Sequence, residues 1–262
     1  MPARAEYPTP HSDVNALIDR LLESIRAILG DRFAGMYLHG SLAIGDFDPV
    51  RSDVDFLVAT AGVLPEDAIR QLAAMHAGVS ESDLPWKTNY EGSYIPLAAL
   101  RRYDRAGSVH PAVEVDGHFG LAGHGSDWII QRHVIRERGV VVSGPSPDRL
   151  IDPISADDLR QAARQVLVGR WAPEAAEPPA RLAGAEYQAY AVLTMCRGLY
   201  TIHFGEVASK PQAARWALQR LDSRWASLIR QALAWRHGLG LDAAEETREF
   251  IRHTLNQISV EP

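Results

Sequence analysis

The spacing of apolar residues changes near residue 150, and this change constrains the fold more than any other feature of the sequence. Before it, amphipathic segments alternate with short apolar runs of strand type, whereas every apolar pattern after it has the period of a helix. Strands that alternate with helices predict an α/β domain, and a series of helices alone predicts a bundle. We therefore predict an α/β domain over residues 1–150 and an all-α helical bundle over residues 151–262.

In the first half, apolar residues recur every three or four positions over residues 11–29, which predicts an amphipathic helix that ends at Gly30. Further helices are expected over residues 65–77 and 126–138. Short apolar runs predict four strands, at residues 33–38, 54–58, 88–95 and 113–119. A loop rich in Gly and Pro follows from residue 143.

The second half begins with Ser155 and Asp158, a spacing typical of a helix N-terminal capping box. The apolar periodicity then predicts five helices, over residues 155–170, 183–204, 211–220, 222–236 and 242–257. The segment 174–179, of sequence EAAEPP, is expected to be an exposed linker between the first two.

Charge and composition limit the classes of partner. The 262 residues carry a formal net charge of −6 and one cysteine, Cys196, which excludes an intrachain disulfide. No apolar run approaches the ~18 residues of a membrane span, and the first residues are not of signal-peptide type. We therefore expect a soluble cytoplasmic monomer that binds neither nucleic acid nor membranes.

Two aspartates at the start of a predicted strand are the clearest candidates for chemistry. Asp53 and Asp55 are two positions apart, so their carboxylates point to the same side of a sheet, ~7 Å apart along the backbone. Two carboxylates this close suit a shared Mg²⁺, which prefers hard oxygen ligands. Gly40 and Ser41 end the preceding strand and offer a permissive turn, a backbone N–H and a hydroxyl for phosphate oxygens.

Gly-Ser, a spacer and Asp-x-Asp between two apolar strands resemble the signature of the nucleotidyltransferase superfamily related to polymerase β. The segment YLHGSLAIGDFDPVRSDVDFLV is similar to that of the aminoglycoside 3''/9 adenylyltransferases, which modify streptomycin and spectinomycin. The later segments VVVSGPSPDRLIDPIS, AVLTMCRGLYT and ASKPQAARWAL also resemble this family, so the similarity spans both halves. It implies an α/β nucleotidyltransferase domain, with a small mixed sheet flanked by helices, followed by a helical domain.

The resemblance also implies roles for residues of the first half. Gly40, Ser41 and Ser52 would bind the nucleotide phosphates, and Asp53 and Asp55 would hold Mg²⁺. Glu91 would be the catalytic base and would meet the acceptor. A third carboxylate near two ionised ones has its pKa raised, which suits a base. Glu114 and Asp116, on the next predicted strand, remain alternatives for this role.

In the second half, the resemblance assigns Lys210 to the triphosphate and Arg197 to the acceptor, with Glu186 near the acceptor as well. Lys210 follows a predicted N-cap, Ser209, and a cation at a helix N-terminus is unfavourable unless an anion binds there. Alternatively, Lys210 is an exposed lysine in a loop, and Arg197 forms a structural ion pair. The chain also departs from the family pattern, since Glu186 and Tyr187 stand where streptomycin-modifying enzymes have an acidic pair.

These observations predict an enzyme that transfers AMP from Mg·ATP to a hydroxyl of a small molecule and releases pyrophosphate. The expected acceptor is streptomycin or spectinomycin. Two alternatives stay open: another hydroxylated acceptor, and a nucleotide-binding regulatory protein with little turnover.

Overall fold

A computed structural model describes residues 8–115, 117–236 and 238–260. The chain divides into two compact units, Met1–Pro153 and Ile154–Pro262, and each is described here by itself. The first unit contains all the strands of the described residues, and the second is built from helices.

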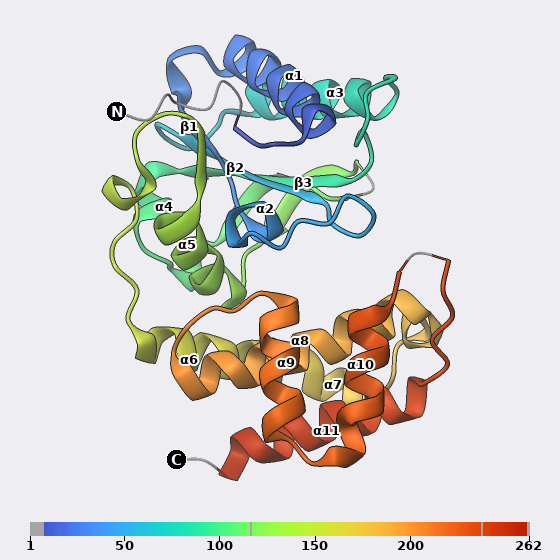
Figure 1. Cartoon of the computed structure of the whole chain (residues 1–262). Helices are drawn as coiled ribbons and strands as arrows, with labels where there is room; N and C mark the ends of the chain where they lie inside the picture. The colour runs from blue at the N-terminus through green and yellow to red at the C-terminus, as the bar shows by residue number, and fades with distance from the viewer. Residues whose placement is uncertain (1–7, 116, 237, 261–262) are drawn as a thin grey trace. The chain divides into compact units, whose positions relative to one another are not determined.

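The first unit is built around one six-stranded sheet, with its strands in the order β5-β4-β3-β2-β1-β6 (Figure 1). The strands are β1 (Phe33–Leu38), β2 (Val54–Thr60), β3 (Tyr90–Pro96), β4 (Val109–Val113), β5 (Phe119–Gly123) and β6 (Val140–Ser143). Only β2 and β3 run parallel; the other neighbouring pairs are antiparallel. The predicted mixed sheet flanked by helices is therefore confirmed.

Helices cover both faces of this sheet. They are α1 (Ser12–Leu29), α2 (Gly40–Ile44), α3 (Glu66–Ser80), α4 (Leu97–Arg101) and α5 (Asp127–Arg138), with short 3₁₀ turns at Gly30–Arg32, Arg105–Gly107 and Pro147–Arg149. The apolar stripes of α1 and α3 pack on the face that carries Phe56, Tyr90 and Tyr94. The opposite face is flanked by α2, α4 and α5 (Figure 1). The alternating side chains of β2 and β3 are therefore divided between a hydrophobic core and a second, more polar face.

Two strand predictions in the first unit are corrected. The single strand expected over residues 113–119 is wrong, because β4 ends at Val113 and β5 begins at Phe119. A tight turn joins them: the N–H of Glu114 donates to the carbonyl of His118 at 2.9 Å, and that of Gly117 donates to Glu114 at 2.8 Å. An Asp-Gly pair at residues 116–117 is a strong hairpin signal, and Gly117 has a φ of +82°. No strand was expected where β6 lies, between the helix predicted to end at residue 138 and the loop predicted from residue 143; β6 pairs with β1.

The second unit consists of helices. They are α6 (Ala156–Val166), α7 (Ala172–Ala176), α8 (Ala185–Phe204), α9 (Lys210–Arg220), α10 (Ala226–Ala234) and α11 (Ala244–Val260), with a π-helical turn at Leu167–Trp171 and 3₁₀ turns at Ala180–Ala183 and Ser223–Trp225. The capping box of α6 is present, since the N–H of Asp158 donates to Ser155 Oγ and the N–H of Ser155 donates to the Asp158 carboxylate, each at 3.1 Å. The predicted helical second half is confirmed.

The exposed linker expected over residues 174–179 is wrong in its first part. The helix continues through the π-helical turn into α7, because Leu167, Trp171 and Ala175 keep a four-residue spacing and are all buried. Glu174 is also tied down: its carboxylate accepts hydrogen bonds from Tyr187 Oη and from Arg181, each at 2.6 Å. The composition of this segment suggested a loop, but burial of its apolar face gives a helix.

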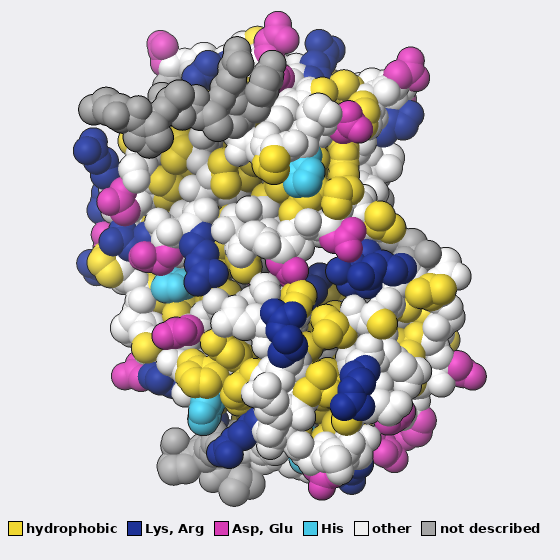
Figure 2. All heavy atoms as spheres, viewed as in Figure 1, with side chains coloured by type: hydrophobic (Ala, Val, Ile, Leu, Met, Phe, Trp, Pro, Cys, Tyr) yellow, Lys and Arg dark blue, Asp and Glu magenta, His cyan; other side chains and the backbone are white. Residues whose placement is uncertain are grey.

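The described helices include none that combines the length and the apolar character needed to cross a membrane. On the face drawn in Figure 2, acidic and basic side chains are interspersed among apolar and neutral ones.

Candidate active site

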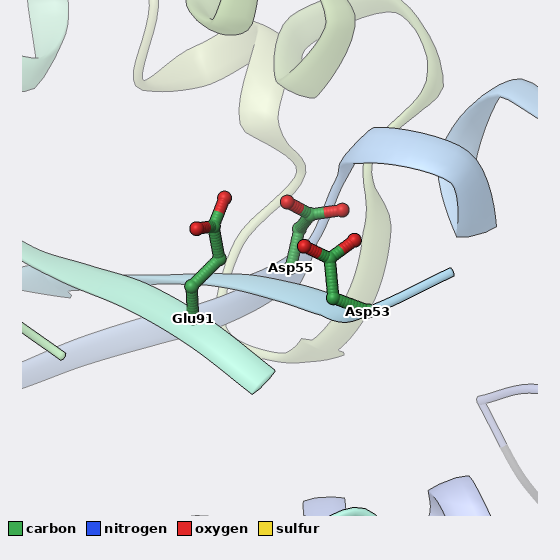
Figure 3. A group of neighbouring side chains, drawn as sticks. All are labelled: Asp53, Asp55 and Glu91. Carbon is green, nitrogen blue, oxygen red and sulfur yellow. The ribbon is translucent and has the colours of Figure 1, made fainter. Parts of the chain in front are cut away.

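Three carboxylates converge at the start of β2 and β3. Asp55 pairs in register with Glu91 on the parallel strand, and Asp53 lies two residues before Asp55. Because side chains alternate along a strand, all three point from the same face of the sheet (Figure 3). One carboxylate oxygen of each lies within 4.8 Å of the other two. This spacing is close enough for one ion to meet all three residues.

Burial and neighbouring negative charges change the pKa of Glu91. Burial, reinforced by the negative charges of Asp55 and Asp53, raises the pKa of Glu91 to about 8. Three carboxylates held this close repel one another when all are ionised, and a divalent cation would remove that repulsion. Carboxylate oxygens are the ligands that Mg²⁺ prefers, so the residues present fit this ion.

The segment His39–Ser41, which leads from β1 into α2, packs directly against Asp55. Gly40 has a φ of +55°, and a Cβ atom there would lie 1.8 Å from Oδ2 of Asp55, so only glycine fits. The N–H of His39 donates to the carbonyl of Asp55 at 3.0 Å. Gly40 and Ser41, expected as a turn after β1, form the start of the short helix α2. The close approach brings the backbone of this segment beside the aspartates.

Two serine hydroxyls belong to the same region. Ser41 Oγ is buried and has no hydrogen-bond partner among the residues that the structure describes. A buried hydroxyl without a partner is unfavourable, so a ligand oxygen at this point would be stabilising. Ser52 Oγ accepts the N–H of Asp48 at 3.0 Å, which braces the loop before Asp53 and leaves the hydroxyl proton available to donate.

Several residues on this face of the sheet were not singled out from the sequence. Ser93 follows Glu91 by two positions on β3, and its Oγ lies 3.1 Å from Nε2 of His124. The His124 ring stacks on Trp128, which lies in the first turn of α5, and the Trp128 and His39 rings meet in an edge-type contact. The spacing of Glu91 and Ser93 is a signal that could have identified Ser93. No local pattern links Ser93 to residues 30 positions away.

The alternatives to Glu91 are separated from this group. Glu114 lies in the turn after β4 and is exposed, because the hairpin replaces the strand that was expected there. Asp116 lies outside the described residues. Of the three acidic residues considered for the base, the structure places Glu91 beside Asp53 and Asp55.

The remaining predicted site residues are in the second unit. Glu186 and Arg197 are eleven positions apart on α8, so they share one helix face; Glu186 is exposed and Arg197 is half-buried. Lys210 is exposed and is the first residue of α9. The expected N-cap is present, since Ser209 Oγ accepts the N–H of Gln212 at 3.3 Å.

Each half of the chain matches a known domain family. Residues 18–93 match the nucleotidyltransferase domain family, and residues 149–260 match the family of aminoglycoside adenylyltransferase C-terminal domains. The first match contains the Gly-Ser segment and the three carboxylates, and the second contains α6 to α11.

Relatives of known activity match over both halves. An aminoglycoside (3'') (9) adenylyltransferase of Shigella flexneri is 26% identical over 277 aligned positions, which cover 97% of this chain and 96% of that protein. A spectinomycin 9-adenylyltransferase of Staphylococcus aureus is 25% identical and covers 79% of each chain.

The fold has a counterpart among solved structures. The spectinomycin adenyltransferase AAD(9) of Enterococcus faecialis, solved with ATP and spectinomycin, has a TM-score of 0.75 at 17% identity and covers 93% of this chain and 98% of its own. The chain therefore joins a nucleotidyltransferase domain to an aminoglycoside adenylyltransferase C-terminal domain, and it is similar to aminoglycoside and spectinomycin adenylyltransferases over most of its length.

Proposed function

We propose that this enzyme transfers AMP from Mg·ATP to a hydroxyl of an aminocyclitol antibiotic, spectinomycin or streptomycin, and releases pyrophosphate. The convergence of Asp53, Asp55 and Glu91 beside the Gly40–Ser41 segment carries the proposal. The relatives support the nucleotide and the acceptor, since their names or structure include adenylyl transfer, ATP and spectinomycin. We further propose that the enzyme works in the cytoplasm as a monomer; its single cysteine, Cys196, agrees with a reducing compartment.

Asp53 and Asp55 would hold the magnesium ion, and Ser41, Ser52 and the backbone at Gly40 would bind phosphate oxygens. Ser41 supports this role most directly, because its buried hydroxyl lacks a partner within the described residues. Bound Mg²⁺ would offset charge on the phosphates and draw the pKa of Glu91 below its metal-free value.

Glu91 would act as the general base. Its carboxylate takes the proton of the acceptor hydroxyl while that oxygen forms a bond to the α-phosphorus of ATP. The bond from the α-phosphorus to the bridging oxygen breaks, and pyrophosphate leaves with the electron pair. The residues of the first unit thereby supply both phosphate positioning and proton transfer.

The helical unit would complete the binding of both substrates. Lys210, at the N-terminus of α9, would contact the triphosphate, because an anion there is favoured by the helix N–H groups and by the ammonium group. Arg197 and Glu186, on one face of α8, would contact the acceptor. We assign nucleotide chemistry to residues 1–150 and acceptor binding with nucleotide clamping to residues 151–262.

The direct test is pyrophosphate release from Mg·ATP in the presence of spectinomycin, streptomycin or a hydroxylated control compound. Asp53→Asn should lower turnover at least about 1000-fold, because a metal ligand is lost from the transition state. Glu91→Gln should lower kcat while leaving ATP binding intact. Asp83→Asn, an exposed aspartate of the same unit, is the matched control and should behave like the wild type.

Release that depends on one antibiotic and on Asp53 would establish the acceptor. Pyrophosphate release with only a different hydroxylated compound would support the proposed AMP transfer but show that the acceptor is not one of these antibiotics. ATP binding without release for any compound would contradict the enzymatic proposal and favour a regulatory role.

A further inference from the structure

We infer that Trp128 is a positioning residue for the nucleotide: stacked on His124, it ties the segment His39–Ser41 to the strand that carries Glu91. The inference rests on the proposed function, because its readout is ATP binding. None of the residues in this His124–Trp128 stack is expected to touch the reacting atoms.

One end of the stack is anchored on β3. Ser93 lies on the same face of this strand as Glu91, two residues further on, and its side chain is buried. The hydrogen bond between Ser93 Oγ and His124 Nε2, at 3.1 Å, fixes the imidazole. The phenol of Tyr103 donates to the carbonyl of His124 at 3.1 Å and holds its backbone.

The indole of Trp128 stacks on this imidazole. The ring centroids of His124 and Trp128 are 3.6 Å apart with an interplanar angle of 7°, which is a parallel, face-to-face stack. Arg132 holds the indole from its own helix: the buried guanidinium lies 5.9 Å from the Trp128 ring and donates to the carbonyls of Trp128, Ala99 and Leu100. Trp128 is therefore fixed at its ring and at its backbone.

The other end of the stack meets the segment that we assign to the phosphates. The Trp128 ring packs against the buried His39 ring with centroids 6.2 Å apart and an interplanar angle of 65°. His39 directly precedes Gly40, where there is no room for even a Cβ beside Asp55. Because that fit is so close, a small displacement of His39 would move Gly40 and Ser41 out of place. Removing the indole would leave space beside His39 and allow this displacement.

The experiment compares Trp128→Leu with Trp128→Phe in the full chain, using calorimetric titration with Mg·ATP and steady-state rates with the aminocyclitol. Trp128→Leu should raise the Kd and KM for ATP roughly tenfold while kcat changes about twofold or less, since Glu91 and the metal ligands are untouched. Trp128→Phe keeps an aromatic ring against His124 and should recover most of the affinity. Ile130→Ala, a half-buried residue of the same helix, controls for general loosening of α5.

A second variant tests the anchor. Ser93→Ala should raise the Kd for ATP in the same direction, and the double variant with Trp128→Leu should add little, because both changes release the same stack. An unchanged Kd in Trp128→Leu, or an equal rise in Ile130→Ala at a matched Tm, would overturn the inference. If the wild type binds ATP but transfers AMP to no aminocyclitol, the proposed acceptor fails while the stack is still tested by the Kd values. A wild type that binds no ATP would overturn both.

Discussion

At the residue scale, the glycines at the two ends of α2 show backbone strain with and without a steric clash: Gly40 is the first residue of the helix, and Gly45 directly follows it. Gly40 and Gly45 both have positive φ values, +55° and +80°, which a side chain tolerates poorly. A Cβ at Gly45 would meet nothing within 4 Å, whereas one at Gly40 would strike the Asp55 carboxylate. Position 40 is therefore restricted by the site itself and position 45 by the local conformation alone.

Gly40→Ala and Gly45→Ala should consequently differ in both stability and activity. Gly45→Ala should lower the free energy of unfolding by about 1 kcal/mol because of the positive φ, and Gly40→Ala should lower it further because a Cβ there strikes Asp55. Only Gly40→Ala should also lower the rate of AMP transfer, by roughly 100-fold, because Asp55 must move. Urea unfolding and initial rates measure the two effects, and equal rates in the two variants would show that the close approach has no role in the reaction.

His76 is a buried base whose neutral form is held by two tyrosines. Its ring nitrogens lie 3.0 Å from Tyr90 Oη and 2.7 Å from Tyr94 Oη, and burial lowers the pKa of His76 to about 3. In the unfolded chain its pKa is about 6.5, so the folded state binds fewer protons between these values. The contribution of His76 to the free energy of unfolding is complete above pH 6.5 and is lost as the pH falls toward 3.

We therefore expect the free energy of unfolding to fall as the pH drops below about 6.5, by up to about 1.4 kcal/mol per pH unit from this group. His76→Gln keeps a hydrogen-bonding side chain that does not titrate, and should flatten the curve relative to the wild type. Denaturant unfolding between pH 7.5 and 4.5 measures both curves. Parallel curves would mean that His76 does not control this acid sensitivity.

At the scale of elements, packing overrides helix propensity where α8 meets the π-helical turn. Gly198 lies within α8, and a Cβ there would be 2.7 Å from Cδ1 of Leu167, whose side chain is fully buried. Gly78, near the end of α3, is exposed and has nothing within 4 Å of the corresponding position. Both glycines lie in helices. They differ because a neighbouring element packs against Gly198 and, among the described residues, none packs against Gly78.

Alanine should have opposite effects at these two positions. Gly78→Ala should stabilise the protein by up to about 1 kcal/mol, as expected for replacing glycine in a helix. Gly198→Ala should destabilise it, because overpacking of a buried leucine costs about 1–3 kcal/mol and exceeds the helical gain. Thermal and urea unfolding measure the stability of both variants. A stabilised Gly198→Ala variant would show that the π-helical turn can shift to accommodate the added Cβ at little cost.

At the scale of the whole molecule, the site lowers the stability of the metal-free protein. Asp53, Asp55 and Glu91 hold oxygens within 4.8 Å of one another, and their mutual repulsion is relieved only by protonation or by a cation. Groups arranged for binding often cost stability in this way. Ion binding to the folded state should therefore appear in global unfolding.

Mg²⁺ should raise the Tm of the wild type, and Asp53→Asn should raise the Tm of the metal-free protein while abolishing most of the response to Mg²⁺. Binding of Mg²⁺ and the Asp53→Asn substitution both reduce the negative charge of the three carboxylates, and therefore their mutual repulsion. Differential scanning calorimetry at fixed pH, with Asp83→Asn as the exposed control, makes the comparison. A response to Mg²⁺ that is equal in all three proteins would place the ion elsewhere.

Much of the architecture could be predicted because it is encoded locally. The three-to-four spacing of apolar residues marks α1, and the change of period near residue 150 separates an α/β half from a helical half. Period-two alternation alone puts Asp53 and Asp55 on one face of a strand. Ser155 and Ser209 identify the starts of α6 and α9 through capping, which involves only neighbours along the chain.

Only the tertiary structure decided which groups meet. Glu91, Glu114 and Asp116 were all candidates for a third carboxylate, and the parallel register of β2 and β3 puts Glu91 opposite Asp55. The helix through Ala175 likewise depends on the burial of its apolar face. The His124–Trp128 stack joins residues that no local pattern connects. Periodicity, capping and turn chemistry act over a few residues, so the sequence alone determined the elements and the paired aspartates, while strand register and side-chain packing between distant segments assembled the site.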